Sequence, residues 1–238
     1  MTQQDNAAGA AGAAGAAVPA WTAETRFSDW LRDAAEPFWT AAAGHRFTRE
    51  LADDSLPDAV YRRYLIQDYL FLDLLVRVVG HAIAAAPSLE ARITLSRFLA
   101  AVTGEENTYF LRSFEALGVD QATLRAATPN APTAAFEEIM LGAAQGGDYA
   151  DVLSVLLPVE WVYLTWAQAV ADQTPTRFYL REWIALHAVP AFADFVGWLR
   201  AEMDREGAAL PPHRQESLAH NVRRIAEQEV AFFDAAYE

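Results

Sequence analysis

The stretch VLSVLLPVEWVYLTWAQAVA, residues 152–171, decides the fold class: it is apolar on nearly every side and holds one side chain that is charged at pH 7, Glu160. Its length equals that of a membrane span. Pro158 and Glu160 interrupt it, however, and the acidic Asp151 and Asp172 flank it, whereas basic residues usually flank a span. We therefore expect a helix buried in the core of a globular protein.

The periodicity of the chain from Trp21 onward is helical throughout. Apolar residues recur at the 3.6-residue period, no stretch alternates apolar and polar residues for long, and Gly and Pro fall mostly at breaks. The sequence predicts an all-α protein. The expected helices cover residues 24–43, 57–85, 87–117, 132–145, 148–172, 176–188, 190–206 and 211–236.

The domain organisation follows from composition. Residues 21–238 contain no Gly-, Ser- or Pro-rich linker, and 53% of the 238 residues are hydrophobic, so we expect one helical bundle with one large core. Residues 1–20 are rich in Ala and Gly and begin without a basic cluster, which predicts a disordered tail and not a signal peptide. With no targeting signal recognised, we expect a cytoplasmic protein.

Charge and cysteine content narrow the functions. The net charge is −14, and binding to nucleic acid or to an anionic membrane depends on Lys and Arg, so neither partner is expected. A small molecule or a protein is the expected partner. The chain has no cysteine, which excludes thiolate catalysis, thiolate metal ligands and disulfides.

Three carboxylates, far apart in the sequence, each lie on an apolar helix face. Asp68 shares its face with Tyr64 and Phe71, and Glu229 shares its face with Phe232, by the spacing of three and four residues. Glu160 lies among leucines. Each carboxylate could be satisfied separately across the bundle, but three together favour a shared polar pocket. Such a pocket, with aromatic walls, suits a flat heteroaromatic ligand that carries ring nitrogens and amino groups.

Metal and cofactor sites have little support in the sequence. Ferritin-like di-metal bundles use Glu-x-x-His pairs, and no Glu-x-x-His occurs here, although other clusters of His, Asp and Glu stay open. No Gly-rich phosphate loop, nucleophile elbow or zincin motif is present. We therefore expect neither a metal nor a cofactor. His187, one turn after Trp183, reads as a core or rim histidine more readily than as a ligand.

Three segments carry a family resemblance. The segments are Tyr64-Leu65-Ile66-Gln67-Asp68-Tyr69, then residues 156–163 with the sequence LLPVEWVY, and finally Glu229 followed by Phe232, Phe233 and Tyr237. In this order and at these separations, the chain from about residue 25 to 238 resembles the TenA / thiaminase II family. The resemblance implies a haem-oxygenase-like fold, a homo-oligomer (tetramer or dimer) and hydrolysis of aminopyrimidines in thiamin salvage, in which a 5-aminomethyl-pyrimidine loses its amine.

The resemblance also implies roles for individual residues. Asp68 would bind the pyrimidine amino group, and Glu229 would lie near the ring nitrogen and the leaving group. Phe71 and Phe136 would form aromatic walls, and Tyr163 would support them. His187 falls where the family usually has a tyrosine, so this contact differs.

Val159 is the main departure from the family pattern. The best-studied branch has its nucleophilic cysteine at this position, and a second branch lacks it, as this chain does. Glu160 is the obvious substitute, but one residue along a helix is a rotation of about 100°. We expect Glu160 or Glu229 to activate a water molecule; direct attack by a carboxylate is the other route. Crowded carboxylates would leave one ionised as base and another protonated as acid.

Two other functions remain open at this point. One is a haem-oxygenase-like metal or cofactor oxidase, which would need a histidine-rich site. The other is a non-catalytic pyrimidine-binding protein that lost turnover together with the nucleophile.

Overall fold

Helices account for nearly all regular structure in residues 19–238, the part of the chain that the computed structural model describes; within these residues there is no strand. The elements are α1 (Phe27–Ala34), α2 (Phe38–Ala43), α3 (Arg46–Ala52), α4 (Asp58–Ala85), α5 (Leu89–Ala101), the π-helix η1 (Val102–Glu106), α6 (Asn107–Ala116), α7 (Gln121–Ala126), α8 (Ala131–Gly146), α9 (Tyr149–Ala169), α10 (Phe178–Ala188), α11 (Pro190–Ala208) and α12 (Pro212–Ala235). The prediction of an all-α protein is confirmed.

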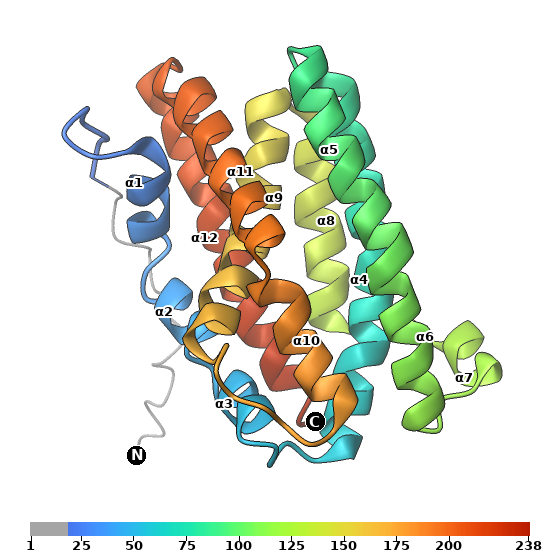
Figure 1. The fold of residues 1–238 in the computed structure, drawn as a ribbon. Helices are drawn as coiled ribbons and strands as arrows, with labels where there is room; N and C mark the ends of the chain where they lie inside the picture. The colour runs from blue at the N-terminus through green and yellow to red at the C-terminus, as the bar shows by residue number, and fades with distance from the viewer. Residues whose placement is uncertain (1–18) are drawn as a thin grey trace, which may run out of the picture.

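The helix α9 forms the centre of the bundle, as its apolar sequence predicts. It packs against α4, α8, α10, α11 and α12, and the long helices run side by side along the molecule (Figure 1). By length and composition α9 could cross a membrane, but 89% of its most apolar window is buried inside the protein. Glu160 therefore lies where the sequence places it, in the interior.

Two predicted helices are divided in the structure. The segment expected at 24–43 forms α1 and α2, with a break at Glu36-Pro37, because proline lacks the N–H that a continuous helix needs. The segment expected at 87–117 contains the π-helix η1 between α5 and α6. The short helices α3 and α7 were not predicted; each begins at a side-chain cap, His45 for α3 and Asp120 for α7.

The described helices share one continuous hydrophobic core, which is what a single domain extending from about residue 21 requires. Its largest fully buried side chains include Trp166, Trp183 and Tyr61. The predicted disordered tail, residues 1–20, lies almost wholly outside the described residues. The domain boundary at residue 20 therefore stays a prediction.

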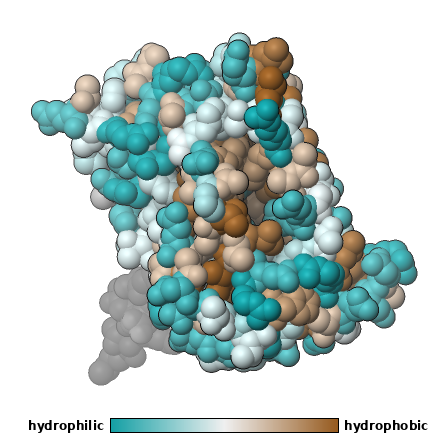
Figure 2. Space-filling model, viewed as in Figure 1, coloured by the Kyte–Doolittle hydropathy of each residue, from teal (hydrophilic) through white to brown (hydrophobic). Residues whose placement is uncertain are grey.

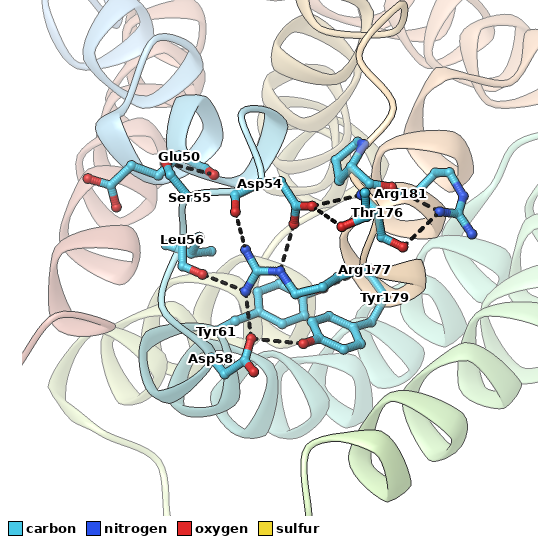
Figure 3. Close-up of polar contacts among 11 residues, drawn as sticks. Glu50, Asp54, Ser55, Leu56, Asp58, Tyr61, Thr176, Arg177, Tyr179 and Arg181 are labelled. Atoms are coloured by element: carbon cyan, nitrogen blue, oxygen red, sulfur yellow. Dashed lines mark hydrogen bonds and ion pairs between the residues drawn. The ribbon is translucent and has the colours of Figure 1, made fainter.

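A polar network fixes the start of α10, the helix that carries Trp183 and His187. Arg177 donates to the Asp54 carboxylate at 2.6 Å and to the carbonyl oxygens of Leu56 and Asp54 at 2.7 Å, and it also reaches Asp58 (Figure 3). Asp54 has a positive φ of 58°, which aspartate tolerates better than most residues. One guanidinium thereby joins the loop before α4 to the loop before α10.

Candidate active site

A cavity of about 490 Å³ opens between α4, the α5–η1–α6 segment, α9, α10 and α11. Figure 2 shows it as a hollow with pale to brown, apolar side chains inside and teal, polar side chains around its rim. Its volume lies in the range of roughly 300–1,000 Å³ that is usual for small-molecule sites. The cavity is therefore large enough to enclose a ring-sized ligand.

Five of the predicted site residues line this cavity, and two do not. Those that line it are Asp68, Phe71, Glu160, Tyr163 and His187. Phe136 instead packs behind the wall, with its ring 5.1 Å from that of Phe71 and 5.9 Å from that of Phe232. Glu229 is 2% exposed and also lies behind the wall. Burial raises the pKa of Tyr163, and the charge of Glu229 raises it further. Burial also raises the pKa of Glu229, with further contributions from Asp68 and Glu160, so Glu229 belongs to the same cluster.

Glu160 reaches the cavity together with its neighbour Val159. Both residues line it, and they are 5% and 4% exposed. Two consecutive helical residues can do this when the cavity covers a wide arc of the helix, since they differ by about 100°. The carboxylate of Glu160 therefore approaches the cavity from a different angle than a side chain at position 159 would.

Two carboxylate oxygens in the site have no hydrogen-bond partner among the described residues: Oδ2 of Asp68 and Oε1 of Glu160. A buried polar atom without a partner costs about 1–3 kcal/mol, more when it is charged. The sequence also allowed each carboxylate to be hydrogen-bonded separately to a group across the bundle. The structure does not show this for these two oxygens. Both atoms are available to a ligand that donates hydrogen bonds.

The carboxyl groups of the site hold their protons more tightly than usual. Burial raises the pKa of Asp68, Glu160 and Glu229 well above the ordinary value for a carboxyl, and the acids raise one another further. For Asp68 the nearby Tyr64 hydroxyl acts in the opposite direction. A cluster of this kind can present protonated carboxyls as donors beside an ionised one as acceptor.

Glu106 is a fourth acid of this cluster, and sequence reasoning missed it. It is half-buried on η1, lines the cavity, and has a pKa that burial raises to about 7. The signal was present, because Glu106 precedes the buried Phe110 by four residues and so shares its face. Thr103, Gly104 and Glu105 directly precede Glu106, so the segment has no apolar pattern that marks Glu106 as inward-facing. A π-helix turn is a frequent feature of functional sites.

A hydrogen-bonded aromatic group supports the cavity wall. The hydroxyl oxygens of Tyr64 and Tyr163 are 2.9 Å apart, and Trp183 Nε1 donates to the Tyr64 hydroxyl at 3.2 Å. Tyr163 and Trp183 line the cavity, whereas the side chain of Tyr64 is 1% exposed and lies behind them. This network fixes the orientation of the Tyr163 hydroxyl at the cavity surface.

His187 contributes a neutral imidazole. Its Nδ1 lies 2.9 Å from the carbonyl oxygen of Trp183, and burial lowers its pKa to about 4. Its ring also lies against those of Tyr163 and Phe192, at centroid distances of 5.0 and 5.3 Å. The residue thus combines a wall position with a polar ring nitrogen.

The acids of the site are not grouped as a metal centre. Within residues 19–238 there is no set of three His, Asp or Glu side chains placed to hold a metal ion. The combination that the cavity does offer is carboxyl acceptors and donors at one end, aromatic faces around them and a neutral histidine. These groups suit the recognition and hydrolysis of a flat, nitrogen-rich ring.

Comparison with known proteins agrees with this picture. The model of the TENA/THI-4/PQQC family matches residues 32–238. The aminopyrimidine aminohydrolase of Halalkalibacterium halodurans is 28% identical over 214 residues, which cover 89% of this chain and 95% of that protein. The aminopyrimidine aminohydrolase of Helicobacter pylori is 24% identical, over 89% of this chain and 98% of that protein.

Solved structures show the same fold. A TenA family transcription regulator from Silicibacter sp. TM1040 superposes with a TM-score of 0.80 at 23% identity, covering 88% of this chain and 96% of that one. A TenA homologue from P. horikoshii OT3 gives a TM-score of 0.79 at 22% identity, covering 90% and 99%. The all-α, haem-oxygenase-like architecture expected from the sequence is confirmed.

Proposed function

Because the chain belongs to the TENA/THI-4/PQQC family, we propose that it is an aminopyrimidine hydrolase that cleaves a C–N bond, releasing the amine from a 5-aminomethyl-pyrimidine in thiamin salvage. The observation that carries the proposal is the pair of unpartnered carboxylate oxygens, on Asp68 and Glu160, in an aromatic cavity. Buried acids without partners are costly, and a ligand with N–H donors offsets this cost.

The pyrimidine binds at the inner end of the cavity. Asp68 accepts hydrogen bonds from its exocyclic amino group, or shares a proton with a ring nitrogen. Phe71 and Tyr163 contact the faces and edge of the ring, and Phe136 supports Phe71 from behind. The neutral His187 replaces the tyrosine that relatives have, and it offers a hydrogen-bond acceptor in place of a hydroxyl.

The base of the reaction is the pair formed by Glu106 and Glu160. Burial raises the pKa of both carboxyls, and the charge of Glu106 raises the pKa of Glu160 further, so the two titrate as a coupled pair in which Glu106, with a pKa of about 7, ionises first. The ionised member takes a proton from water, and the water oxygen attacks the methylene carbon. Valine at position 159 has no nucleophilic atom, which is why the attacking group has to come from solvent or a carboxylate.

The departing amine needs a proton, and a carboxyl that is still protonated supplies it. Glu229 is that acid in our assignment, acting through the cluster because it lies behind the cavity wall. Over the whole reaction one C–N bond breaks, one C–O bond forms, and the proton taken from water balances the proton given to the amine. The route needs no cofactor.

Purified protein given 4-amino-5-aminomethyl-2-methylpyrimidine should release ammonia and the hydroxymethyl compound, without added metal. In water labelled with oxygen-18, one labelled oxygen should appear in the product after a single turnover. If carboxylate attack were the route, that first turnover would instead transfer an unlabelled oxygen from the protein.

Glu160→Gln should keep the fold and lower the hydrolysis rate about 100-fold or more, because it removes one of the two carboxyls, Glu106 and Glu160, that act as the general base. Glu138→Gln is the control, since Glu138 is exposed on α8. Full activity in Glu160→Gln would remove Glu160 from the mechanism.

Tight pyrimidine binding by the wild-type protein without any product would instead identify a non-catalytic binding protein. Val159 favours this alternative because it has no nucleophilic atom. Near-stoichiometric iron in the purified protein would support an oxidase.

We also propose where in the cell the protein acts and how many copies of it assemble. The family resemblance supports a cytoplasmic homo-oligomer, tetramer or dimer, with the pyrimidine as its partner and neither nucleic acid nor membrane. Size-exclusion chromatography with light scattering measures the assembly state directly.

A further inference from the structure

The helical turn that carries Glu106 has few side-chain hydrogen bonds to the rest of the bundle. The hydroxyls of Thr103 and Thr108 each donate to the carbonyl oxygen four residues earlier, at 2.8 and 2.9 Å, so both bonds stay within the α5–η1–α6 segment. Gly104, at the middle of η1, favours a helix less than any residue except proline. Among the described residues, one side-chain hydrogen bond joins residues 102–108 to a helix outside this segment.

That bond comes from Tyr69 on α4. Its hydroxyl donates to Oδ1 of Asn107, the first residue of α6, at 3.2 Å. The ring of Tyr69 packs against the rings of Phe110 and Phe114, at centroid distances of 5.3 and 5.4 Å. Tyr69 and Asn107 are half-buried, and neither lines the cavity. The packed ring holds the hydroxyl in place, and the hydroxyl holds the start of α6.

The two partners of this bond are the sequence neighbours of two acids of the site. Tyr69 directly follows Asp68, and Asn107 directly follows Glu106. Both acids line the cavity. Burial raises the pKa of Asp68, and the charge of Glu106 raises it further, so the two carboxyls lie close enough to interact. One hydrogen bond therefore joins the two backbone segments that present these carboxyls.

We propose that Tyr69 is a positioning residue: its hydrogen bond to Asn107 holds the η1 turn so that the carboxyl of Glu106 stays buried in the cavity. This role rests on the proposed function, in which Glu106 is part of the general base. Tyr69 does not reach the cavity, so it acts on the reaction through Glu106. Without the bond the turn loosens, and the Glu106 carboxyl gains access to solvent beside the exposed Glu105. A solvated carboxylate is a weaker base than a buried one.

The charged and titratable groups around Glu106 come from every helix that forms the cavity wall. They are Asp68, Arg97, Glu105, Glu160, Tyr163, His187 and Asp194. On α6, the first charged side chain is Arg112, which pairs with Glu182. Tyr69→Phe changes none of these groups and adds no charge. A lower pKa of Glu106 in this variant therefore reports a loss of burial, which is the cause that raises its pKa to about 7 in the wild-type protein.

The test compares Tyr69→Phe with a change at its partner. In Tyr69→Phe, kcat should fall about tenfold, and the rise of kcat/KM with pH should move down by about one pH unit, because Glu106 is more solvated and less precisely placed. Asn107→Asp keeps an acceptor oxygen for the Tyr69 hydroxyl and adds a negative charge beside Glu106, so the rise should instead move to higher pH. General loosening of the fold would not move the two profiles in opposite directions.

A double-mutant cycle assigns the effect to the bond itself. Asn107→Leu should resemble Tyr69→Phe, and the double variant should be no worse than either single variant. Tyr149→Phe is the matched control: the Tyr149 hydroxyl also donates to a side-chain oxygen, that of Glu202 at 3.1 Å, and neither residue lines the cavity. This control should leave kcat and the pH profile unchanged. Losses that add in the double variant would overturn the inference, as would an unchanged pH profile in Tyr69→Phe.

Two measurements separate this inference from the proposed reaction, because they do not depend on turnover. Amide hydrogen exchange of residues 102–108, measured by mass spectrometry, should become about tenfold faster in Tyr69→Phe and stay the same in Tyr149→Phe. Carbon-13 NMR, with Glu106→Gln to assign the signal, should show a pKa of Glu106 of about 7 in the wild-type protein and a lower pKa in Tyr69→Phe.

Both results in a protein that hydrolyses no aminopyrimidine would establish the role of Tyr69 in placing Glu106, while the hydrolase function fails. Unchanged exchange together with an unchanged pKa of Glu106 would overturn the inference, whatever the activity. Circular dichroism confirms that each variant is folded.

Discussion

The Nδ1 atom of His187 donates its proton to the carbonyl oxygen of Trp183 at 2.9 Å. A carbonyl oxygen is only an acceptor, so Nδ1 must carry the hydrogen, and in the neutral ring Nε2 is then an acceptor. Burial lowers the pKa of the imidazole to about 4, which keeps the ring neutral across the physiological range. The α10 backbone thus determines which nitrogen can accept a hydrogen bond from a ligand.

The first prediction concerns this tautomer. In nitrogen-15 NMR spectra, the ring of His187 should show the Nδ1–H neutral form, with no titration between pH 8 and about pH 5 and protonation near pH 4. The unfolded protein should titrate near the ordinary value of about 6.5. Because the native pKa is depressed, His187 lowers stability progressively as pH falls from about 6.5 toward 4. An imidazolium signal for His187 at pH 6 would contradict this assignment.

The second prediction concerns Glu106 and the pH dependence of kcat/KM. In the wild-type protein the first ionisation of the Glu106–Glu160 pair occurs near pH 7, the pKa of Glu106, so kcat/KM should rise with pH through about 7. In Glu106→Gln the first ionisation has to come from Glu160, which is more deeply buried and has desolvation as the main cause of its raised pKa. The rise should therefore move to higher pH.

The control for this shift is Glu115→Gln, which alters an exposed glutamate on α6. It should leave the profile in place. A rise in kcat/KM that stays at the same pH in Glu106→Gln would show that the titrating base is another residue.

The third prediction concerns the stability cost of the acid cluster. The pKa of Glu229 is raised in the folded protein, so the native state binds more protons than the unfolded state above about pH 4.5, and stability falls as pH rises. Glu229→Gln removes this titration. The variant should be more stable than wild type at pH 8 by about 1–2 kcal/mol, a Tm increase of about 2–8 °C, with the difference shrinking toward pH 4.5.

Glu227→Gln, two residues earlier and exposed on α12, is the matched control and should change Tm little at either pH. A Tm for Glu229→Gln that is below the wild-type value at pH 8 would mean that the ionised carboxylate is stabilised in the fold. A wild-type protein that is less stable than Glu229→Gln at pH 8, but keeps a functional acid, shows the usual trade-off between stability and activity at active sites.

The sequence predicts the helices and the inward carboxylates well, because both depend on local periodicity. Asp68, Glu160 and Glu229 share faces with large apolar side chains, and all three are buried. Whether a buried acid also reaches a cavity depends on neighbouring helices. For that reason the sequence places Glu229 and Glu160 together, whereas in the structure only Glu160 lines the cavity.

The π-helix η1 interrupts the regular helix that periodicity predicts for residues 87–117, so the apolar residues of α5 do not place Glu106 correctly, and only its spacing to Phe110 in α6 does. A single regular helix at 87–117 fixes the facing of each residue at 100° steps, and the wider turn of η1 changes that register between Val102 and Glu106. The acid that the change brings to the cavity, Glu106, was therefore not among the predicted site residues. The cavity wall beyond this turn depends on α5 and α11, which are far apart in sequence.

The last prediction concerns Arg177, whose guanidinium joins the loops before α4 and α10 (Figure 3). Its side chain is 24% exposed and bonds Asp54, Asp58 and two backbone carbonyls, so Arg177→Met should cost roughly 2–3 kcal/mol of unfolding free energy. Arg112→Met is the control: its partner is Glu182 on α10, both side chains are more exposed, and about 0–1 kcal/mol is expected.

The stability difference between wild type and Arg177→Met should also depend on pH. The hydrogen bonds from Thr176 and Arg177 lower the pKa of Asp54 to about 2, so the stabilisation from Asp54 is complete above its unfolded value of 3.8 and is lost as pH falls toward 2. In chemical denaturation, the stability difference between wild type and Arg177→Met should therefore be constant from pH 8 to 5 and narrow below pH 4. Because the network orients the start of α10, the variant should also weaken pyrimidine binding through Trp183 and His187. A stability difference that persists unchanged at pH 2.5 would show that Arg177 stabilises the fold through its backbone contacts and not through Asp54.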